Sequence, residues 1–252
     1  MIIKNPESRD ISLLRQLWKN AFGDTDAFLD KFFETGFSFD RCRILTVDGN
    51  LAAGLYWFDC LWDGKKVAYL YAVATDEAYQ NKGLCRALME DTHRHLKQSG
   101  YHGAALVPGN EGLFSLYEKF GYRSFCPMET KKVPGKAAGI SLQEIDADTY
   151  NALRKSLLPA DSLLQEGATL SFLATFAKFY QGDNCLLSAY EENGILHICE
   201  YFGQESTLGN IAKATNAEFA VARIPGGNKP TAMYLDFTGE ESLPEYLGIP
   251  LN

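Results

Sequence analysis

The sequence predicts an α/β (α+β) protein with a mixed, mostly antiparallel sheet flanked by helices, followed by a smaller α/β lobe. Three observations predict this class. Runs rich in β-branched and aromatic residues alternate with amphipathic segments of helical period along the 252 residues. The turn pairs Asp48-Gly49 and Asp63-Gly64 separate three consecutive strand-like runs, which indicates an antiparallel meander. Periodicity lapses at residues 132–139, where Pro, Gly and Ala concentrate, and the order of elements then partly repeats.

The first half of the chain alternates most clearly. Asp10 is placed to open a helix, in which Leu17 and Trp18 belong to an apolar set at helical spacing. Gly100 and Gly121 follow the last periodic residues of two later helices and are the expected stops. The expected elements are a strand at 2–6, helices at 10–23 and 24–37, strands at 41–47, 51–61 and 65–75, a helix at 84–100, a strand at 101–110, a helix at 111–121 and a strand at 122–133.

The second half repeats this order in a shorter and weaker form. Its expected elements are a strand at 141–145, helices at 148–158 and 163–182, a hairpin at 184–203 around Asn193-Gly194, a helix at 206–216 and strands at 217–225 and 231–237. We therefore expect a first domain at 1–133 and a C-terminal lobe at 140–252. Two origins of the repeat stay open, an ancient duplication or the chance alternation of any α/β chain.

Composition argues against several classes of function. The formal net charge of −8 and the pI of about 5.1 argue against nucleic acid as the main partner and are compatible with a small cationic substrate. The N-terminus has no signal-peptide core, and no run approaches the ~18 apolar residues that span a bilayer. The six cysteines contain no C-x-x-C pair. We therefore expect a cytoplasmic protein with reduced, buried cysteines and no membrane partner. His93 and His95 point apart on a helix, so we expect no metal.

Residues 79–85 (YQNKGLC) form a loop between a strand and a helix. A helix start offers unpaired N–H groups and the positive end of the helix dipole, which together bind phosphate. Gly83 allows the backbone to approach an anion closely, Lys82 adds positive charge, and Asn81 adds a donor. The spacing is neither that of a Walker loop nor that of a dinucleotide fold. A diphosphate carried by a nucleotide or by coenzyme A suits such a loop.

Two motifs give this loop a family resemblance. The spacing Gln80-x-x-Gly83-x-Cys85 resembles the acyl-CoA loop of the GCN5-related N-acetyltransferase (GNAT) superfamily, whose usual form is Gln/Arg-x-x-Gly-x-Gly/Ala. Downstream, Tyr117 with Gly121 and Tyr122 resembles the second motif of that superfamily, Tyr-x-x-x-Gly-Phe/Tyr. The resemblance covers about residues 1–133. The segment 72–83 also resembles the multi-lobed branch, in which a degenerate GNAT-like lobe follows the first.

The resemblance implies an acetyl-CoA-dependent N-acetyltransferase with the GNAT fold and no metal. The acceptor would be a primary amine of a small molecule or protein, attacking the thioester directly. The strand before the loop would pair with the pantetheine arm, the loop would hold the diphosphate, and Tyr117 would protonate the leaving thiolate. The alternative for Tyr117 is a core aromatic that shares the face of Leu113 and Phe120. The implied cofactor-binding residues are Val73, Ala74, Thr75, Gln80, Asn81, Lys82, Gly83, Leu84, Cys85 and Asn110.

The general base stays open at this point. Family members often carry a glutamate on the meander strands, where this chain offers Asp59, Tyr69 and Tyr71 instead. An ordered water or, as in some multi-lobed relatives, the carboxylate of the last residue, Asn252, are the other possibilities. Cys85 is either a nucleophile or, as we favour, a slightly large occupant of a position that needs a small residue.

The second half has no counterpart of the loop or of Tyr117, so we expect one cofactor site. The second lobe would then form a wall of the acceptor pocket or the surface of a homodimer. Its aromatic residues at helical spacing are more simply core; they are Phe172, Phe176, Phe179 and Tyr180. The rival hypothesis for the whole chain is a CoA-binding sensor or interaction module that keeps the fold and performs no transfer.

Overall fold

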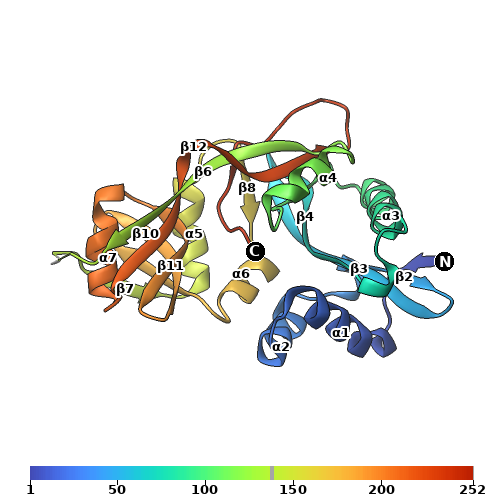
Figure 1. Ribbon diagram of the computed structural model, residues 1–252. Coiled ribbons are helices and arrows are strands. Elements are labelled where there is room, and N and C mark those ends of the chain that lie inside the picture. Colours follow the sequence, from blue (N-terminus) through green and yellow to red (C-terminus); the bar gives the residue numbers. More distant parts are fainter. Residues whose placement is uncertain (137–138, 252) are drawn as a thin grey trace. The chain divides into compact units, whose positions relative to one another are not determined.

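The computed structural model describes residues 1–136 and 139–251 and divides into two compact units (Figure 1). The first unit holds Met1–Arg123 together with Tyr234–Leu243. The second holds Ser124–Met233 and the chain from Pro244 onward. Among the described residues, no helix is long and apolar enough to cross a membrane.

The sheet of the first unit is an antiparallel meander with one parallel neighbour. Its strands, in spatial order, are β1 (Ile2–Lys4), β2 (Cys42–Val47), β3 (Asn50–Trp62), β4 (Lys65–Thr75) and β5 (Gly103–Leu106), followed by the end of β12 (Phe219–Asp236). The β1–β4 pairs are antiparallel and the β4–β5 pair is parallel. Asp48-Gly49 and Asp63-Gly64 all have positive φ, as tight hairpin turns require. The predicted meander is therefore confirmed.

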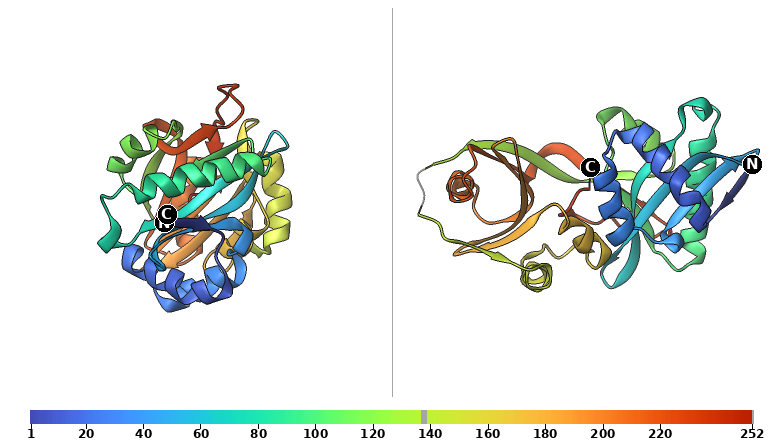
Figure 2. Two further views of the ribbon diagram at one scale, coloured as in Figure 1. Left: turned by 90° about the vertical axis from the view of Figure 1, so that its right-hand side faces the viewer. Right: turned by 90° about the horizontal axis from the view of Figure 1, so that it is seen from below.

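Helices cover both faces of this sheet. On one face, α1 (Ile11–Phe22) and α2 (Asp26–Thr35) bury Trp18 and Phe32 against Tyr56, with ring centroids 5.2 and 5.1 Å from that tyrosine. On the other face lies α3 (Leu84–Gln98), which buries Leu88 and Leu96. The left view of Figure 2 shows α3 across one face and the blue helices across the other. This layering follows from alternation along β3, whose successive side chains point to opposite faces.

A segment from far along the chain completes the first unit. Tyr234, near the end of β12, is 1% exposed and packs edge-on against Trp62. Its ring occupies the space beside Gly103, where an added Cβ would lie 2.1 Å from the Tyr234 hydroxyl oxygen. After the strand, Phe237 donates its backbone N–H to the His102 carbonyl at 2.9 Å. Residues 234–243 are therefore part of the core of this unit.

The connections of the first unit are short. Single-turn 3-10 helices lie at η1 (Ser8–Asp10), η2 (Phe39–Arg41), η3 (Glu77–Tyr79) and η4 (Glu111–Leu113), and α4 (Phe114–Glu118) continues the last of these. Strand β6 (Arg123–Pro134) leads from the first unit into the second. The helix expected at 111–121 is thus divided into two short pieces.

The sheet of the second unit has a strand order similar to that of the first unit. Its sheet runs in the order β7 (Leu142–Ile145), β9 (Lys178–Gly182), β10 (Cys185–Glu192), β11 (Ile195–Phe202) and β12, with the last pair parallel. Its other elements are α5 (Ala147–Leu157), β8 (Ser162–Gln165), α6 (Ala168–Leu173), η5 (Glu205–Thr207), α7 (Leu208–Ala214) and β13 (Tyr246–Leu247). Helix α7 packs Leu208 and Ile211 onto an apolar sheet face that includes Leu187 and Ile198.

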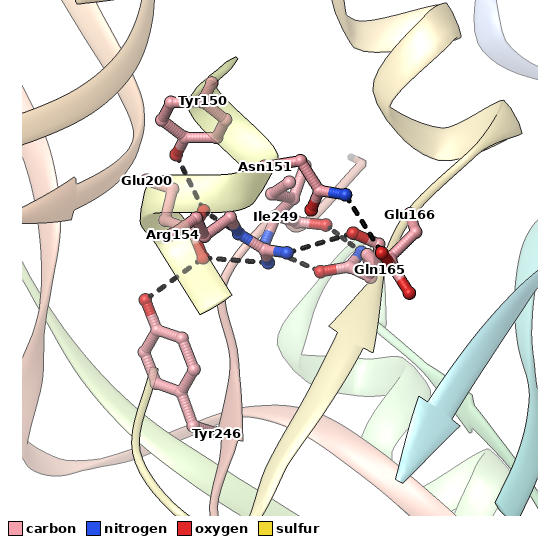
Figure 3. A network of polar contacts seen from close by, with 8 residues as sticks. All are labelled: Tyr150, Asn151, Arg154, Gln165, Glu166, Glu200, Tyr246 and Ile249. Atoms are coloured by element: carbon pink, nitrogen blue, oxygen red, sulfur yellow. Dashed lines mark hydrogen bonds and ion pairs between the residues drawn. The ribbon is translucent and has the colours of Figure 1, made fainter. Parts of the chain in front are cut away.

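A fully buried ion pair lies on α5 and β11 (Figure 3). Arg154 and Glu200 are both 0% exposed at their side chains, and the guanidinium donates to both carboxylate oxygens. Tyr150 donates to the same carboxylate at 2.7 Å, and Tyr246 does so at 3.5 Å. A third Arg154 nitrogen donates to the Gln165 carbonyl at 2.9 Å. Burial of these charges is tolerated because they are paired and hydrogen-bonded.

Two predictions for the second half were wrong. Residues 163–182 do not form one helix but β8, α6 and β9, because Gly167 at φ 51° interrupts the helical period and the flanking segments pair with β13 and β10. The strands expected at 217–225 and 231–237 are a single strand, β12, which stays extended through Gly226 at φ 134°. The linker expected at 132–139 begins inside β6, and residues 137–138 lie outside the described residues.

Candidate active site

The second half of β4 contains a β-bulge in its pairing with β3 and is not paired with its other neighbour, β5. The parallel pairing of β4 with β5 runs only from Val67 to Tyr69, whereas the pairing with β3 continues to Thr75. Between Tyr71 and Ala74 the register with β3 shifts, and Ala72 adopts φ 49°. Such a bulge bends a strand and re-aims its side chains. The stretch Val73–Thr75 therefore offers one edge at which an extended ligand can pair with backbone N–H and C=O groups.

The loop after β4 is folded onto itself by polar contacts. Asp76 accepts the backbone N–H of Ala78 at 3.0 Å, and Gln80 donates its side-chain amide to the Thr75 carbonyl at 3.3 Å. Lys82 donates to the Ala78 carbonyl at 2.8 Å. These bonds close the turn η3 and fix the start of α3.

The start of α3 has the geometry of an anion cradle. Asn81 and Gly83 have φ 59° and 76°, and this left-handed turn aims the chain into the helix. The amides of Leu84 and Cys85 belong to the first turn, whose N–H groups have no acceptor within a helix. A Cβ at Gly83 would meet none of the described atoms within 4 Å, so the approach to these amides is open. A phosphate group fits this arrangement.

A cavity of about 1050 Å³ adjoins this strand and loop. Val73, Ala74, Thr75 and Gln80 line it, as do Asp76 and Glu77, while α1 contributes its last turns; the α1 residues are Leu17, Asn20, Ala21 and Phe22. The other predicted cofactor residues do not line this cavity; they are Asn81, Lys82, Gly83, Leu84, Cys85 and Asn110. Asn110 is exposed and precedes η4. The cavity thus combines the strand edge with an α1 surface that the sequence did not identify.

Tyr117 is buried on α4, with 8% of its surface exposed. Burial, and then the proximity of Cys85, raise the pKa of its phenol well above the usual value. The phenol is therefore protonated at neutral pH. Burial also raises the pKa of the Cys85 thiol, and Arg86 offsets this only in part. A neutral thiol is a poor nucleophile, so the chemistry of the site favours the small-residue interpretation of Cys85.

Two of the strand residues considered as the general base, Asp59 and Tyr71, lie in different environments. Asp59 accepts from the Tyr101 hydroxyl and pairs at 3.5–3.6 Å with Lys66 and Arg41. Along β4 it lies opposite Ala68, seven residues before Thr75, so it is far from the loop. Burial, Tyr69 and then Asp24 raise the pKa of Tyr71, so its phenol cannot accept a proton at neutral pH. Asn252 lies outside the described residues.

Asp24 is a candidate site residue that the sequence did not identify. Its carboxylate accepts the indole N–H of Trp18 at 2.7 Å, and its charge contributes to the raised pKa of Tyr71 next to the bulge. The residue lies in the short connection after Gly23, the left-handed cap of α1. No local pattern marks it, because its place beside β4 depends on how α1 packs on the sheet. Among the described residues, no cluster of three or more His, Cys, Asp or Glu could hold a metal ion.

Comparisons with known proteins agree with the fold of the first unit. Residues 3–125 match the family model described as acetyltransferase (GNAT) domain. No curated protein matches the sequence. Several solved structures share the fold at low sequence identity.

Three of these structures span most of this chain. A GCN5-related N-acetyltransferase from Anabaena variabilis has a TM-score of 0.70 at 14% identity, over 92% of this chain and 72% of that chain. Eis1 from Mycobacterium abscessus has a TM-score of 0.70 at 12% identity, over 95% and 75%. A putative acetyltransferase from Pyrococcus horikoshii has a TM-score of 0.65 at 13% identity, over 99% and 94%. Residues 3–125 therefore form a GNAT acetyltransferase domain.

Proposed function

We propose that the protein is an acetyl-CoA-dependent N-acetyltransferase that acetylates a primary amine by direct attack. The observation that carries the proposal is the open edge at Val73–Thr75, which the loop at residues 76–83 connects to the first turn of α3. A strand edge suits the amide-containing pantetheine arm, and a helix start suits the diphosphate. The two features are continuous in the chain, as the two parts of coenzyme A are.

The cofactor-binding roles follow from this arrangement. Val73, Ala74 and Thr75 pair with the pantetheine arm through their backbone groups. The loop from Gln80 to Cys85 holds the diphosphate through the backbone N–H groups of Leu84 and Cys85, with Asn81, Lys82 and Gly83 shaping the approach. Asn110 is a further cofactor-side contact.

The transfer needs one acid and a neutral amine. The amine nitrogen attacks the thioester carbonyl, the C–S bond breaks, and the leaving sulfur takes a proton from Tyr117. The nitrogen releases its proton to solvent, and solvent returns a proton to the Tyr117 phenolate. A positioned acid of this kind contributes about 10²–10⁴-fold to a rate. The raised pKa of Tyr117 keeps it in the protonated form that this role requires.

The cavity lining favours a cationic acceptor. Asp76 and Glu77 are its only charged lining residues among those described, and Asp24 lies near the bulge of β4. A wall with carboxylates and no cation attracts a protonated amine, which loses its proton before attack. The same assay tests small molecules and peptides as acceptors.

The test is CoA release from acetyl-CoA with a panel of amines, from diamines to lysine peptides. The proposal predicts turnover that depends on the amine and a binding stoichiometry of one CoA per chain by calorimetry. Tight CoA binding without turnover on any amine would instead favour a CoA-binding sensor. Because the second unit repeats the strand order without the loop, we also propose that it is a degenerate GNAT-like lobe at about residues 140–252.

A further inference from the structure

Helix α3 contacts the Tyr117–Tyr122 segment at two points. The Arg86 guanidinium lies 5.0 Å from the ring centroid of Phe120. Seven residues later, Nε2 of His93 is 2.9 Å from the hydroxyl oxygen of Tyr122. Residues seven apart lie on the same face of a helix. One face of the helix that begins at the proposed diphosphate site therefore also contacts the segment that carries Tyr117.

That segment has little structure of its own. Helix α4 contains only five residues, and an isolated helix of this length is unstable in water. Gly121 at φ 89° turns the chain back, and the N–H of Tyr122 donates to the Tyr117 carbonyl at 3.2 Å. The position of Tyr117 therefore depends on what holds the residues that follow it.

Tyr122 is the fixed member of this segment. It is 2% exposed, and its ring meets that of Tyr117 edge-on, with centroids 5.8 Å apart. The imidazole of His93 lies 5.6 Å from the Tyr122 ring and 5.8 Å from that of Phe237. Burial lowers the pKa of His93 to about 4, so the contact with Tyr122 joins two neutral groups at physiological pH. A buried neutral hydrogen bond fixes a ring without adding charge.

We propose that His93 and Tyr122 are positioning residues for acetyl transfer. Their hydrogen bond fixes the Tyr122 ring, and this ring sets where the phenol of Tyr117 points. The inference rests on the proposed acid role of Tyr117 and goes beyond the residues that touch the cofactor. Neither His93 nor Tyr122 exchanges a proton with the substrate.

The test is a double-variant cycle on kcat. Tyr122→Phe keeps the ring and removes only the hydroxyl, and we expect it to lower kcat about tenfold with the KM for acetyl-CoA changed less than twofold. This loss is smaller than the ~10²-fold that a 1 Å misplacement can cost. In a Tyr117→Phe background the same change should lower kcat by less than twofold, because its effect passes through Tyr117. His93→Gln, which retains a hydrogen-bonding group, should keep more activity than His93→Leu.

A matched control separates positioning from general stability. Tyr101→Phe also removes a buried phenol hydroxyl, one that donates to Asp59 and accepts from Trp57, at the opposite end of α3 from the loop. It should leave kcat unchanged while lowering stability by a similar amount. A kcat loss in Tyr122→Phe no larger than in Tyr101→Phe would overturn the proposal.

Two further outcomes are distinguishable. If the wild type shows no turnover, the proposed function fails and the inference fails with it. If the wild type turns over and Tyr117→Phe is impaired, but Tyr122→Phe acts equally in both backgrounds, only the positioning role fails. In ¹³C-tyrosine-labelled protein, the Tyr117 ring resonance should broaden or shift in Tyr122→Phe, and an unchanged resonance would contradict the inference without any assay of activity.

Discussion

Replacing Glu200 by glutamine should destabilise the second unit strongly. The carboxylate accepts two guanidinium N–H groups of Arg154 and the hydroxyls of Tyr150 and Tyr246, and both charged side chains are fully buried. Glu200→Gln keeps the shape and leaves the guanidinium charge unpaired in the interior. Removing one partner of such a pair costs about 3–5 kcal/mol. For a chain of this size, about 2–4 °C per kcal/mol gives a fall in Tm of roughly 6–20 °C.

The assay can separate the two units by their chromophores. All three tryptophans, Trp18, Trp57 and Trp62, belong to the first unit, so indole fluorescence reports that unit and far-UV circular dichroism reports the whole chain. We expect the dichroism midpoint in urea to fall. The control is Glu144→Gln, which breaks an ion pair with Lys178 at 2.8 Å that is more than half exposed on both sides. Because that pair is exposed to solvent, its loss should leave the dichroism midpoint almost unchanged.

Removing both charges should partly rescue the stability lost in Glu200→Gln. Arg154→Met combined with Glu200→Leu removes both charges and should be more stable than Glu200→Gln alone, since an uncompensated buried charge costs more than an apolar replacement of the pair. A loss below about 1 kcal/mol in Glu200→Gln would refute the argument. It would mean that the guanidinium finds other acceptors or water in the folded protein.

Three further predictions concern the first unit. Gly83→Val forces a β-branched residue into φ 76°, at about 1–2 kcal/mol of strain, so the Kd for CoA measured by calorimetry should rise about tenfold or more. The control Cys85→Ala should bind CoA and turn over as the wild type does. Equal CoA affinity in Gly83→Val and the wild type would contradict the anion cradle at the start of α3. Because burial raises the pKa of Tyr117, its phenol stays protonated as the pH rises, and kcat should not fall between pH 7 and 10. A fall in kcat over this range that disappears in Tyr117→Phe would contradict the prediction. A fragment of residues 1–133 lacks Tyr234 beside Gly103, so its unfolding followed by fluorescence should no longer be cooperative. Addition of a peptide of residues 234–243 should restore cooperative unfolding. A fragment as stable as the full chain would refute the structural role of residues 234–243.

Local signals in the sequence predicted most of the first unit. Glycine turns at positive φ, such as Gly49 and Gly64, and the caps of α1 and α3 are decided by neighbouring residues, so the meander and its helices were predictable. The bulge at Ala72 was not, since alanine rarely adopts φ 49° and only the pairing with β3 imposes it. The return of residues 234–243 to the first unit was also missed. It depends on the fit of Tyr234 against Gly103, which are 131 positions apart in the printed sequence.

In the candidate site, too, local features could be predicted from the sequence and tertiary ones could not. The loop from Gln80 to Cys85 is contiguous, and its place between a strand and a helix predicted a helix start suited to phosphate. The α1 wall of the cavity and Asp24 depend on tertiary packing, and no spacing rule marks them. In the second half, the apolar run at 163–182 has both helical and strand-like character, and pairing with β10 and β13 decided between them.

We propose that Tyr117 supplies the proton to the leaving thiolate in a single acetyl-transfer site. The most direct measurement compares kcat for wild type and Tyr117→Phe at saturating acetyl-CoA and amine, with CoA affinity measured in parallel. We expect kcat to fall by about 10²-fold or more while the Kd for CoA stays within about twofold. An unchanged kcat in Tyr117→Phe would contradict it and leave Tyr117 as a core aromatic.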